Sequence, residues 1–192
     1  MKYNHRYILT GGPGTGKSTI LDVLQKAGHL CLPESAREII KHRIAAGLEP
    51  RPDPQAFASA ILQRDIEQYL SIPSLAQPVF IDRGIADALC MLEATGAIGL
   101  PEAKTKLSMY PLNQCVFFFY PWEAIYCHDD ERDQSFEQCQ AVCRRLESWY
   151  ENLGFTLIKV PNTTPELRAD FILNHIAATL QDSSPEPPSP AR

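Results

Sequence analysis

The chain has 192 residues, of which 44% are hydrophobic and 21% charged, and its formal net charge is -5. This length favours one domain with a sizeable core. No apolar run approaches the roughly 18 residues that a membrane span needs. The apolar stretch near the N-terminus is too short for a secretory signal, so we expect no membrane span and a cytoplasmic location. The acidic balance, without a visible basic cluster, argues against nucleic acid as the main partner.

Predicted strands and helices alternate along the chain, which is typical of an α/β fold. We expect strands over 6–10, 29–32, 78–84, 114–120 and 155–160, and helices over 17–27, from Ser35, from Asp53-Pro54 and over 165–180. The later strands are apolar almost throughout, as in a parallel sheet covered by helices on both faces. Ser35 and Glu38 have the spacing of a capping box, and Asp53 followed by proline is another helix start.

The domain organisation follows from composition. Residues 1–181 form one domain, and its long polar segment at about 121–135 is a candidate lid, because loops of that length are more often functional than accidental. The tail at 182–192 is rich in proline and serine, so we expect it to be disordered.

The six cysteines do not have disulfide or zinc spacing. Cys139 and Cys143 could chelate a metal from one helix, but they belong to a stripe with steps of three and four, which predicts a buried helix face. This stripe consists of Phe136, Cys139, Cys143, Leu146, Tyr150 and Leu153. The segment CHDD at 127–130 is a weaker metal candidate, since its side chains are adjacent rather than spaced.

A phosphate-binding loop follows the first predicted strand. The segment Gly11-Gly12-Pro13-Gly14-Thr15-Gly16-Lys17-Ser18 fits G-x-x-x-x-G-K-[ST], and Thr19 continues into the helix. Glycines allow the backbone to approach phosphate oxygens, and successive N–H groups together with the helix N-terminus favour an anion. Lys17 would reach the β and γ phosphates, and the Ser18 hydroxyl would hold Mg²⁺. The motif therefore predicts binding of ATP or GTP with Mg²⁺.

The strand at 78–84 ends in Asp82 followed by Arg83. Asp82 is a candidate metal ligand, and Arg83 suits a second phosphoryl-bearing or anionic ligand better than an attacking water. A surface Asp-Arg pair remains the alternative. A water-activating ATPase would usually carry Glu after this Asp, and the guanine-reading N-K-x-D motif is absent as well.

Glu34 and Arg37 follow the second predicted strand, and both are candidates for the site that binds the phosphate acceptor. Strand carboxyl ends face the phosphate site in this kind of fold, so Glu34 could accept the proton of a substrate hydroxyl. Arg37 could bind the acceptor. For Glu34 there is an equally open alternative: a solvated carboxylate at a helix N-terminus, which the helix dipole would favour without any catalytic role.

Two further candidates lie in loops. Arg132, among four acidic neighbours, could close on the transferring phosphoryl group, although an exposed ion pair is the alternative. The segment VPNTTP at 160–165 could cover the base of a nucleotide.

Together, the loop at 11–18, PESAR at 33–37, VFIDRG, the polar segment with Arg132, and YENLGFTLIKVP resemble a known family. They are similar to the small P-loop kinase-type domains grouped with the ribosylnicotinamide kinase domain of NadR and labelled AAA-type ATPases. The resemblance implies a three-layer α/β/α sandwich with a five-stranded parallel sheet of order 2-3-1-4-5. Deoxynucleoside kinases carry a Glu after the second strand and Asp/Glu-Arg after the third, features that fall here on Glu34, Asp82 and Arg83. This chain has DRG where those kinases have DRY or ERS.

These observations favour an ATP- and Mg²⁺-dependent kinase of a small hydroxyl-bearing, nucleoside-like metabolite. In this hypothesis Lys17 stabilises the phosphoryl group, Glu34 is the base, Arg83 and Arg37 bind the acceptor, and Arg132 belongs to the lid. The alternative is a regulatory nucleotide-binding module with slow turnover, since the same group also contains relatives of nucleotide- and phosphoinositide-binding trafficking regulators.

Overall fold

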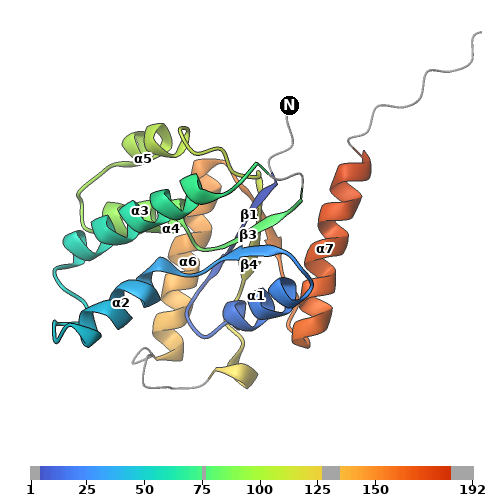
Figure 1. Ribbon diagram of the computed structural model, residues 1–192, viewed down its shortest axis with the longest axis horizontal. Coiled ribbons are helices and arrows are strands. Elements are labelled where there is room, and N and C mark those ends of the chain that lie inside the picture. Colours follow the sequence, from blue (N-terminus) through green and yellow to red (C-terminus); the bar gives the residue numbers. More distant parts are fainter. Residues whose placement is uncertain (1–4, 75–76, 127–134, 183–192) are drawn as a thin grey trace, which may run out of the picture.

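The computed structural model describes residues 5–74, 77–126 and 135–182. In these residues one parallel sheet has the order β2-β3-β1-β4-β5 (Figure 1). Its strands are β1 (Arg6–Gly11), β2 (Leu30–Leu32), β3 (Val79–Asp82), β4 (Cys115–Phe119) and β5 (Thr156–Lys159). The predicted strand order is therefore confirmed.

Helices cover both faces of the sheet (Figure 1). They are α1 (Lys17–Lys26), α2 (Ser35–Ala45), α3 (Pro54–Ser71), α4 (Ile85–Ala94), α5 (Leu100–Leu107), the short 3-10 helix η1 (Glu123–Ile125), α6 (Phe136–Leu153) and α7 (Pro165–Asp182). The buried side chains of α1 and α7 belong to one core cluster. Most buried apolar side chains of α3, α4, α5 and α6 belong to another on the opposite face, and a small third cluster lies between α3 and α4. This is the predicted three-layer α/β/α sandwich.

Alternating side chains of the central strands explain the two cores. Tyr7 and Leu9 of β1 join the cluster that contains α1 and α7, whereas Ile8 joins the cluster on the other face. In β4, Phe117 and Phe118 divide in the same way. Because both faces are covered, these strands are apolar at nearly every position.

The strand register positions the functional site. β1 runs into the phosphate-binding loop, and Leu9 is the register partner of Asp82 at the end of β3. Leu32 of β2 is paired with Ile81, so Glu34 emerges at the same edge. Parallel strands thus bring three predicted segments together at one carboxyl edge.

The helix starts were predicted in part. The Asp53 side chain accepts hydrogen bonds of 3.0 Å from the N–H groups of Gln55 and Ala56, as the sequence predicted. The capping box predicted at Ser35 is wrong. Glu34 takes the N-cap position and Ser35 is the first residue of α2, so Ser35 lies one residue too late to cap the helix. Its hydroxyl instead donates to Asp65 of α3 at 2.5 Å and accepts from Gln68 at 3.2 Å, so tertiary contacts replace the local motif.

Helices α4 and α5 were not predicted from the sequence. The apolar stripe predicted for α6 is confirmed for its central residues. Cys139, Cys143, Leu146 and Tyr150 are all buried. Within the described ranges no helix is both long and apolar enough to cross a membrane.

Candidate functional site

The phosphate-binding loop requires glycine where it approaches β4 and α6. Gly11 has φ 139°, and a Cβ atom there would lie 2.1 Å from the carbonyl oxygen of Phe119. A Cβ atom on Gly12 would lie 2.6 Å from the Cys139 sulfur and 2.8 Å from the Cys143 sulfur. These distances exclude any side chain without displacement of the neighbours, so the loop lies directly on α6.

The two cysteines of α6 support this loop. The Gly12 N–H donates to Cys143 Sγ at 2.9 Å, and Cys139 Sγ donates to the Pro13 carbonyl oxygen at 3.0 Å. Their burial agrees with the predicted core role. In the described part of the chain, no three His, Cys, Asp or Glu side chains group as metal ligands. The thiols therefore set the position of the loop backbone.

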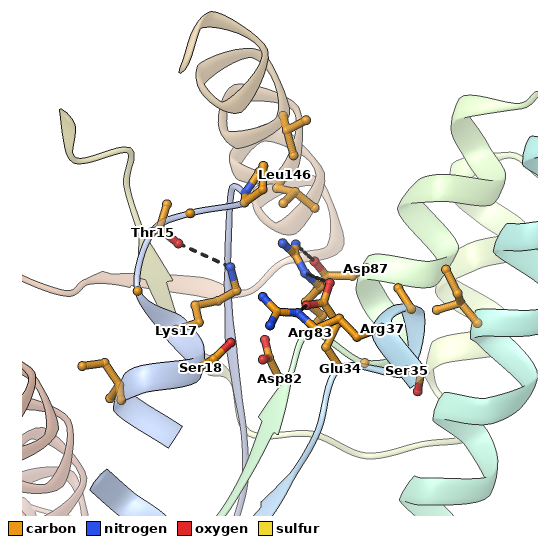
Figure 2. Close-up of a pocket in the computed structure, with 18 of the residues that line it drawn as sticks. Thr15, Lys17, Ser18, Glu34, Ser35, Arg37, Asp82, Arg83, Asp87 and Leu146 are labelled. Carbon is orange, nitrogen blue, oxygen red and sulfur yellow. Dashed lines mark hydrogen bonds and ion pairs between the residues drawn. The ribbon is translucent and has the colours of Figure 1, made fainter. Parts of the chain in front are cut away.

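Lys17 lies inside the loop that it follows. Its Nζ donates to the carbonyl oxygen of Gly12 at 2.8 Å and lies 3.3 Å from Thr15 Oγ1 (Figure 2). Its side chain is buried. Burial and the nearby Arg83 lower the pKa of Lys17 to about 8, against the opposing effect of Asp82. The ammonium group is therefore a desolvated cation in the centre of the loop.

Asp82 has a buried oxygen, Oδ1, that no described residue hydrogen-bonds. Burial raises the pKa of its carboxyl to about 6, reinforced by Glu34 and opposed by Lys17. In Figure 2 the Ser18 hydroxyl points toward this carboxylate. A hydroxyl and a carboxylate are the hard oxygen donors that Mg²⁺ prefers. The residues present therefore fit the predicted magnesium site.

Glu34 and the two predicted acceptor arginines form one cluster (Figure 2). Glu34 Oε1 accepts from Arg83 Nε at 2.9 Å, and its Oε2 accepts from Arg37 Nε at 3.1 Å. Burial opposes ionisation of Glu34, but Arg83, Lys17 and Arg37 together hold its pKa below the ordinary value. Glu34 is thus an ionised, partly buried carboxylate, and a merely solvated carboxylate at a helix end is excluded.

Arg83 connects this cluster to the phosphate-binding loop. Its Nη1 donates to the Gly11 carbonyl oxygen at 2.9 Å and lies 3.3 Å from Asp87 Oδ1. Burial would lower the pKa of Arg83, but Glu34, Asp87 and Asp82 raise it above its ordinary value. Among the described residues other than glycine, only Arg83 has a positive φ, of 70°. It is therefore a fixed part of the site and not a surface side chain.

Asp87 of α4 was missed by sequence reasoning. This buried carboxylate accepts from Thr10 Oγ1 at 2.7 Å and from the Tyr150 hydroxyl at 2.5 Å, besides its contact with Arg83. Burial and Asp87 raise the pKa of Tyr150 well above its ordinary value. Asp87 thereby connects β1, α4 and α6 behind the loop. An acidic residue within the apolar segment IADALC was the signal that could have identified it.

Arg168 of α7 was also missed. Its Nη1 donates to the Thr15 carbonyl oxygen at 3.1 Å, and its guanidinium carbon lies 4.8 Å from the centre of the Phe119 ring. Within the part of the chain that the structure describes, its Nε and Nη2 have no partner, and burial lowers the pKa of the guanidinium group. Arg168 therefore fixes the outer side of the phosphate-binding loop. Arg168 lies four residues before the buried Ile172, so both are on the buried face of α7.

One cavity of about 1050 Å³ contains these groups and extends to both sides of the loop. On the α7 side it reaches Trp122, Ile125 and the segment Asn162–Thr164, which includes part of the predicted base-covering loop. On the other side it runs between α2, α3, α4 and α6. Arg132 and most of the predicted lid, residues 127–134, lie outside the described residues, as does the tail from 183 onward.

Comparison with solved structures shows the same fold in nucleotide kinases. The deoxyadenosine kinase from M. mycoides, with products dCMP and a flexible dCDP bound, has a TM-score of 0.62 at 14% identity and covers 90% of this chain and 99% of its own. The thymidylate kinase from Candida albicans has a TM-score of 0.62 at 15% identity, covering 93% of each chain. The YorR protein from Bacillus subtilis, in complex with phosphorylated GDP, has a TM-score of 0.58 at 13% identity and covers 92% of this chain and 98% of its own.

At sequence identities of 13% to 15%, the similarity to these structures shows a shared fold alone. No curated protein sequence matches the chain. A family model described as AAA domain matches residues 6–168. The chain therefore belongs to this AAA domain family and has a P-loop fold of the nucleotide-kinase type.

Proposed function

We propose that this protein is a phosphotransferase that moves the γ-phosphoryl group of ATP or GTP to the hydroxyl of a small, nucleoside-like metabolite. The observation that carries the proposal is the position of the Glu34–Arg83 pair. It lies beside the phosphate-binding loop, where the cavity continues beyond the loop between α2, α3, α4 and α6. A nucleotide on one side of the pair and an acceptor on the other would meet there.

The nucleotide would occupy the α7 side of the cavity. The loop from Gly11 to Thr19 would bind its phosphates through backbone N–H groups, and the segment Asn162–Thr164 would lie along the base. Lys17 now binds carbonyl oxygens of its own loop. We expect its ammonium group to exchange these oxygens for phosphate oxygens, which carry more negative charge.

Ser18 and Asp82 would hold Mg²⁺. The partnerless Asp82 oxygen supports this role, because an unpaired buried carboxylate is unfavourable until a cation or donor satisfies it. When bound, the ion would neutralise charge on the phosphates.

Glu34 would take the proton of the acceptor. The acceptor oxygen attacks the γ-phosphorus and forms the new P–O bond, the bond to the β-phosphate oxygen breaks, and the nucleoside diphosphate leaves. The proton of the hydroxyl passes to Glu34, which is ionised and therefore able to receive it. Its pKa is low for a base, which suits a loose transition state in which proton transfer is late.

Arg83 would position Glu34 and the loop, because its guanidinium contacts both. Arg37, half-exposed beside Glu34, would bind the acceptor. Arg132 would approach the transferring phosphoryl group from the lid. No carboxylate follows Asp82 to orient water, which supports transfer over hydrolysis.

The test is acceptor-dependent turnover. The purified protein is given ATP or GTP with Mg²⁺ and a pool of nucleosides, and the products are identified by mass spectrometry. A phosphorylated nucleoside, with nucleotide consumption above the rate in buffer, is the expected result. Equal slow consumption with and without the pool would instead favour the regulatory module with slow turnover.

A further inference from the structure

The acceptor side of the cavity has apolar walls. Its lining includes Ile40, Phe57, Ile61, Ala88, Met91 and Leu146, contributed by α2, α3, α4 and α6. Phe57, Ile61 and Ala88 form a buried cluster of their own, against which Ile40 packs. Apolar side chains with a few charged neighbours are typical of a site that binds a ring or another largely apolar body.

Three buried carboxylates also line the cavity, Asp65, Asp82 and Asp87. Asp82 is assigned to the metal and Asp87 binds Thr10, Tyr150 and Arg83, which leaves Asp65 as the candidate for a ligand contact. Its side chain is 6% exposed. Oδ1 accepts the Ser35 hydroxyl at 2.5 Å, and Gln68 in turn donates to Ser35 at 3.2 Å. The described residues give Asp65 one hydrogen bond, from Ser35 to Oδ1, and Asp65 lines the cavity. The group therefore has a fixed orientation and one unused acceptor oxygen.

The charge state of Asp65 suits an acceptor near neutral pH. Burial raises its pKa to about 7, the carboxylates of Asp87 and Glu34 act in the same direction, and the Ser35 hydrogen bond and Arg83 oppose them. Above this pH the carboxylate only accepts hydrogen bonds, and below it a protonated Oδ2 donates. Because Asp65 lines the cavity, a ligand that supplies an N–H group at this point gains a charge-assisted hydrogen bond, and a ligand that covers the carboxylate without such a group leaves it desolvated and unpaired.

We infer that the phosphate acceptor carries a heteroaromatic ring with an amino group, that the ring lies between the apolar walls, and that its N–H donates to Asp65. This inference rests on the proposed function and specifies its substrate class: amino-bearing nucleosides. Asp65 is then a specificity residue of the acceptor site. Ser35, which binds Asp65, follows Glu34 in the chain, and Arg83 binds both Glu34 and the phosphate-binding loop. A ring at Asp65 would therefore direct its sugar hydroxyl along these residues toward the γ-phosphate.

Two matched pairs of compounds test the inference. Adenosine is compared with purine riboside, and cytidine with 2-pyrimidinone riboside, which lack only the amino group. For each we would measure kcat/KM with ATP and Mg²⁺, and the Kd without nucleotide by calorimetry. The expected preference for at least one amino compound is about tenfold or more, because the analogue leaves a charged acceptor unpaired.

The variant Asp65→Asn removes the charge but can still accept the Ser35 hydrogen bond. It should bring the ratio for each pair close to one and leave the Kd of the des-amino compound unchanged. The control Glu67→Gln alters an exposed side chain on the same helix and should keep the wild-type ratio. A measurement on the wild type does not depend on the folding of a variant. Its preference for the amino compound should decline as the pH falls below about 7.

The outcomes separate the two claims. Phosphorylation of nucleosides without an amino preference, or a preference that survives in Asp65→Asn, would overturn this inference and leave the proposed function intact. An amino preference in binding that disappears in Asp65→Asn, with no product formed, would support the ring site and contradict the kinase function. Failure of every nucleoside to bind would overturn the inference.

Discussion

Arg83 Nε donates to Glu34 Oε1 at 2.9 Å, although the two residues are 49 positions apart in the chain. The contact joins the ends of the adjacent strands β2 and β3. Arg83 also binds the Gly11 carbonyl oxygen, so the candidate base and the phosphate-binding loop share one guanidinium group. Its positive φ of 70° is unfavourable for a residue other than glycine. The surrounding contacts therefore fix this backbone, which orients both segments.

Glu34→Gln should slow acceptor-dependent turnover by roughly 10²–10⁴-fold, the usual loss for a positioned general base, with little change in nucleotide affinity. The control is Glu38→Gln on the same helix. Glu38 forms an exposed ion pair with Arg64 at 3.1 Å, and we expect no catalytic defect there. Steady-state kinetics and nucleotide binding measured for both variants check this. Equal defects would reduce Glu34 to a helix-end charge.

Asp82→Asn should weaken the Mg²⁺ dependence of nucleotide binding. The amide has the same shape but lacks the charge that the partnerless oxygen brings to the site. The gain in nucleotide affinity as Mg²⁺ is raised should be smaller in the variant than in the wild type, and added Mg²⁺ should stabilise the variant less. An unchanged Mg²⁺ titration would exclude Asp82 as a metal ligand.

Gly12→Ala should destabilise the protein by about 1–3 kcal/mol, the range for overpacking, because its Cβ atom would meet both cysteine sulfurs. For a chain of this size the melting temperature should fall by about 2–4 °C per kcal/mol. Adding Cys139→Ala removes the nearer sulfur and should restore part of the loss. Gly99→Ala is the control, since its Cβ atom would find only an ordinary contact of 3.6 Å with Pro101. Equal melting temperatures for Gly12→Ala and Gly99→Ala would contradict the close packing of the loop on α6.

Asp65 should make stability depend on pH. Its pKa is raised to about 7 in the folded protein, against about 3.9 in an unfolded chain. Between these values the folded state holds a proton that the unfolded state has released, so this contribution to stability falls as the pH rises. Asp65→Asn lacks the titration. Its melting temperature relative to wild type should rise from pH 4 to 7 and then level, whereas a constant difference would argue against a buried, titrating carboxyl.

The apolar strands predicted a parallel sheet, the spacing G-x-x-x-x-G-K-[ST] predicted the phosphate-binding loop, and the sheet order came from the family resemblance. Parallel topology was then sufficient to predict that Glu34, Asp82 and Arg83 meet. The capping box at Ser35 failed because Glu34 takes the N-cap position and the Ser35 hydroxyl binds Asp65 and Gln68, about 30 residues away. Such long-range partners have no local signal.

The missed residues share a different kind of signal. Asp65 follows Phe57 and Ile61 at steps of four on the buried face of α3, and Arg168 precedes Ile172 and Ile176 in the same way on α7. A charged residue at an apolar helix position indicates a buried polar contact. The sequence does not reveal what that contact is, because the partner belongs to another element.

The measurement that tests the central claim most directly is nucleotide turnover by the wild-type protein with and without nucleosides, at saturating Mg²⁺ and ATP or GTP. We predict slow hydrolysis alone and acceptor-dependent turnover on the order of 1–100 s⁻¹, as is typical of kinases. The variant Lys17→Met serves as the inactive control and should remain folded, because it replaces a buried cation by an apolar side chain of similar length. Fast hydrolysis without acceptor, unchanged by any nucleoside and with no phosphorylated product, would contradict the kinase account.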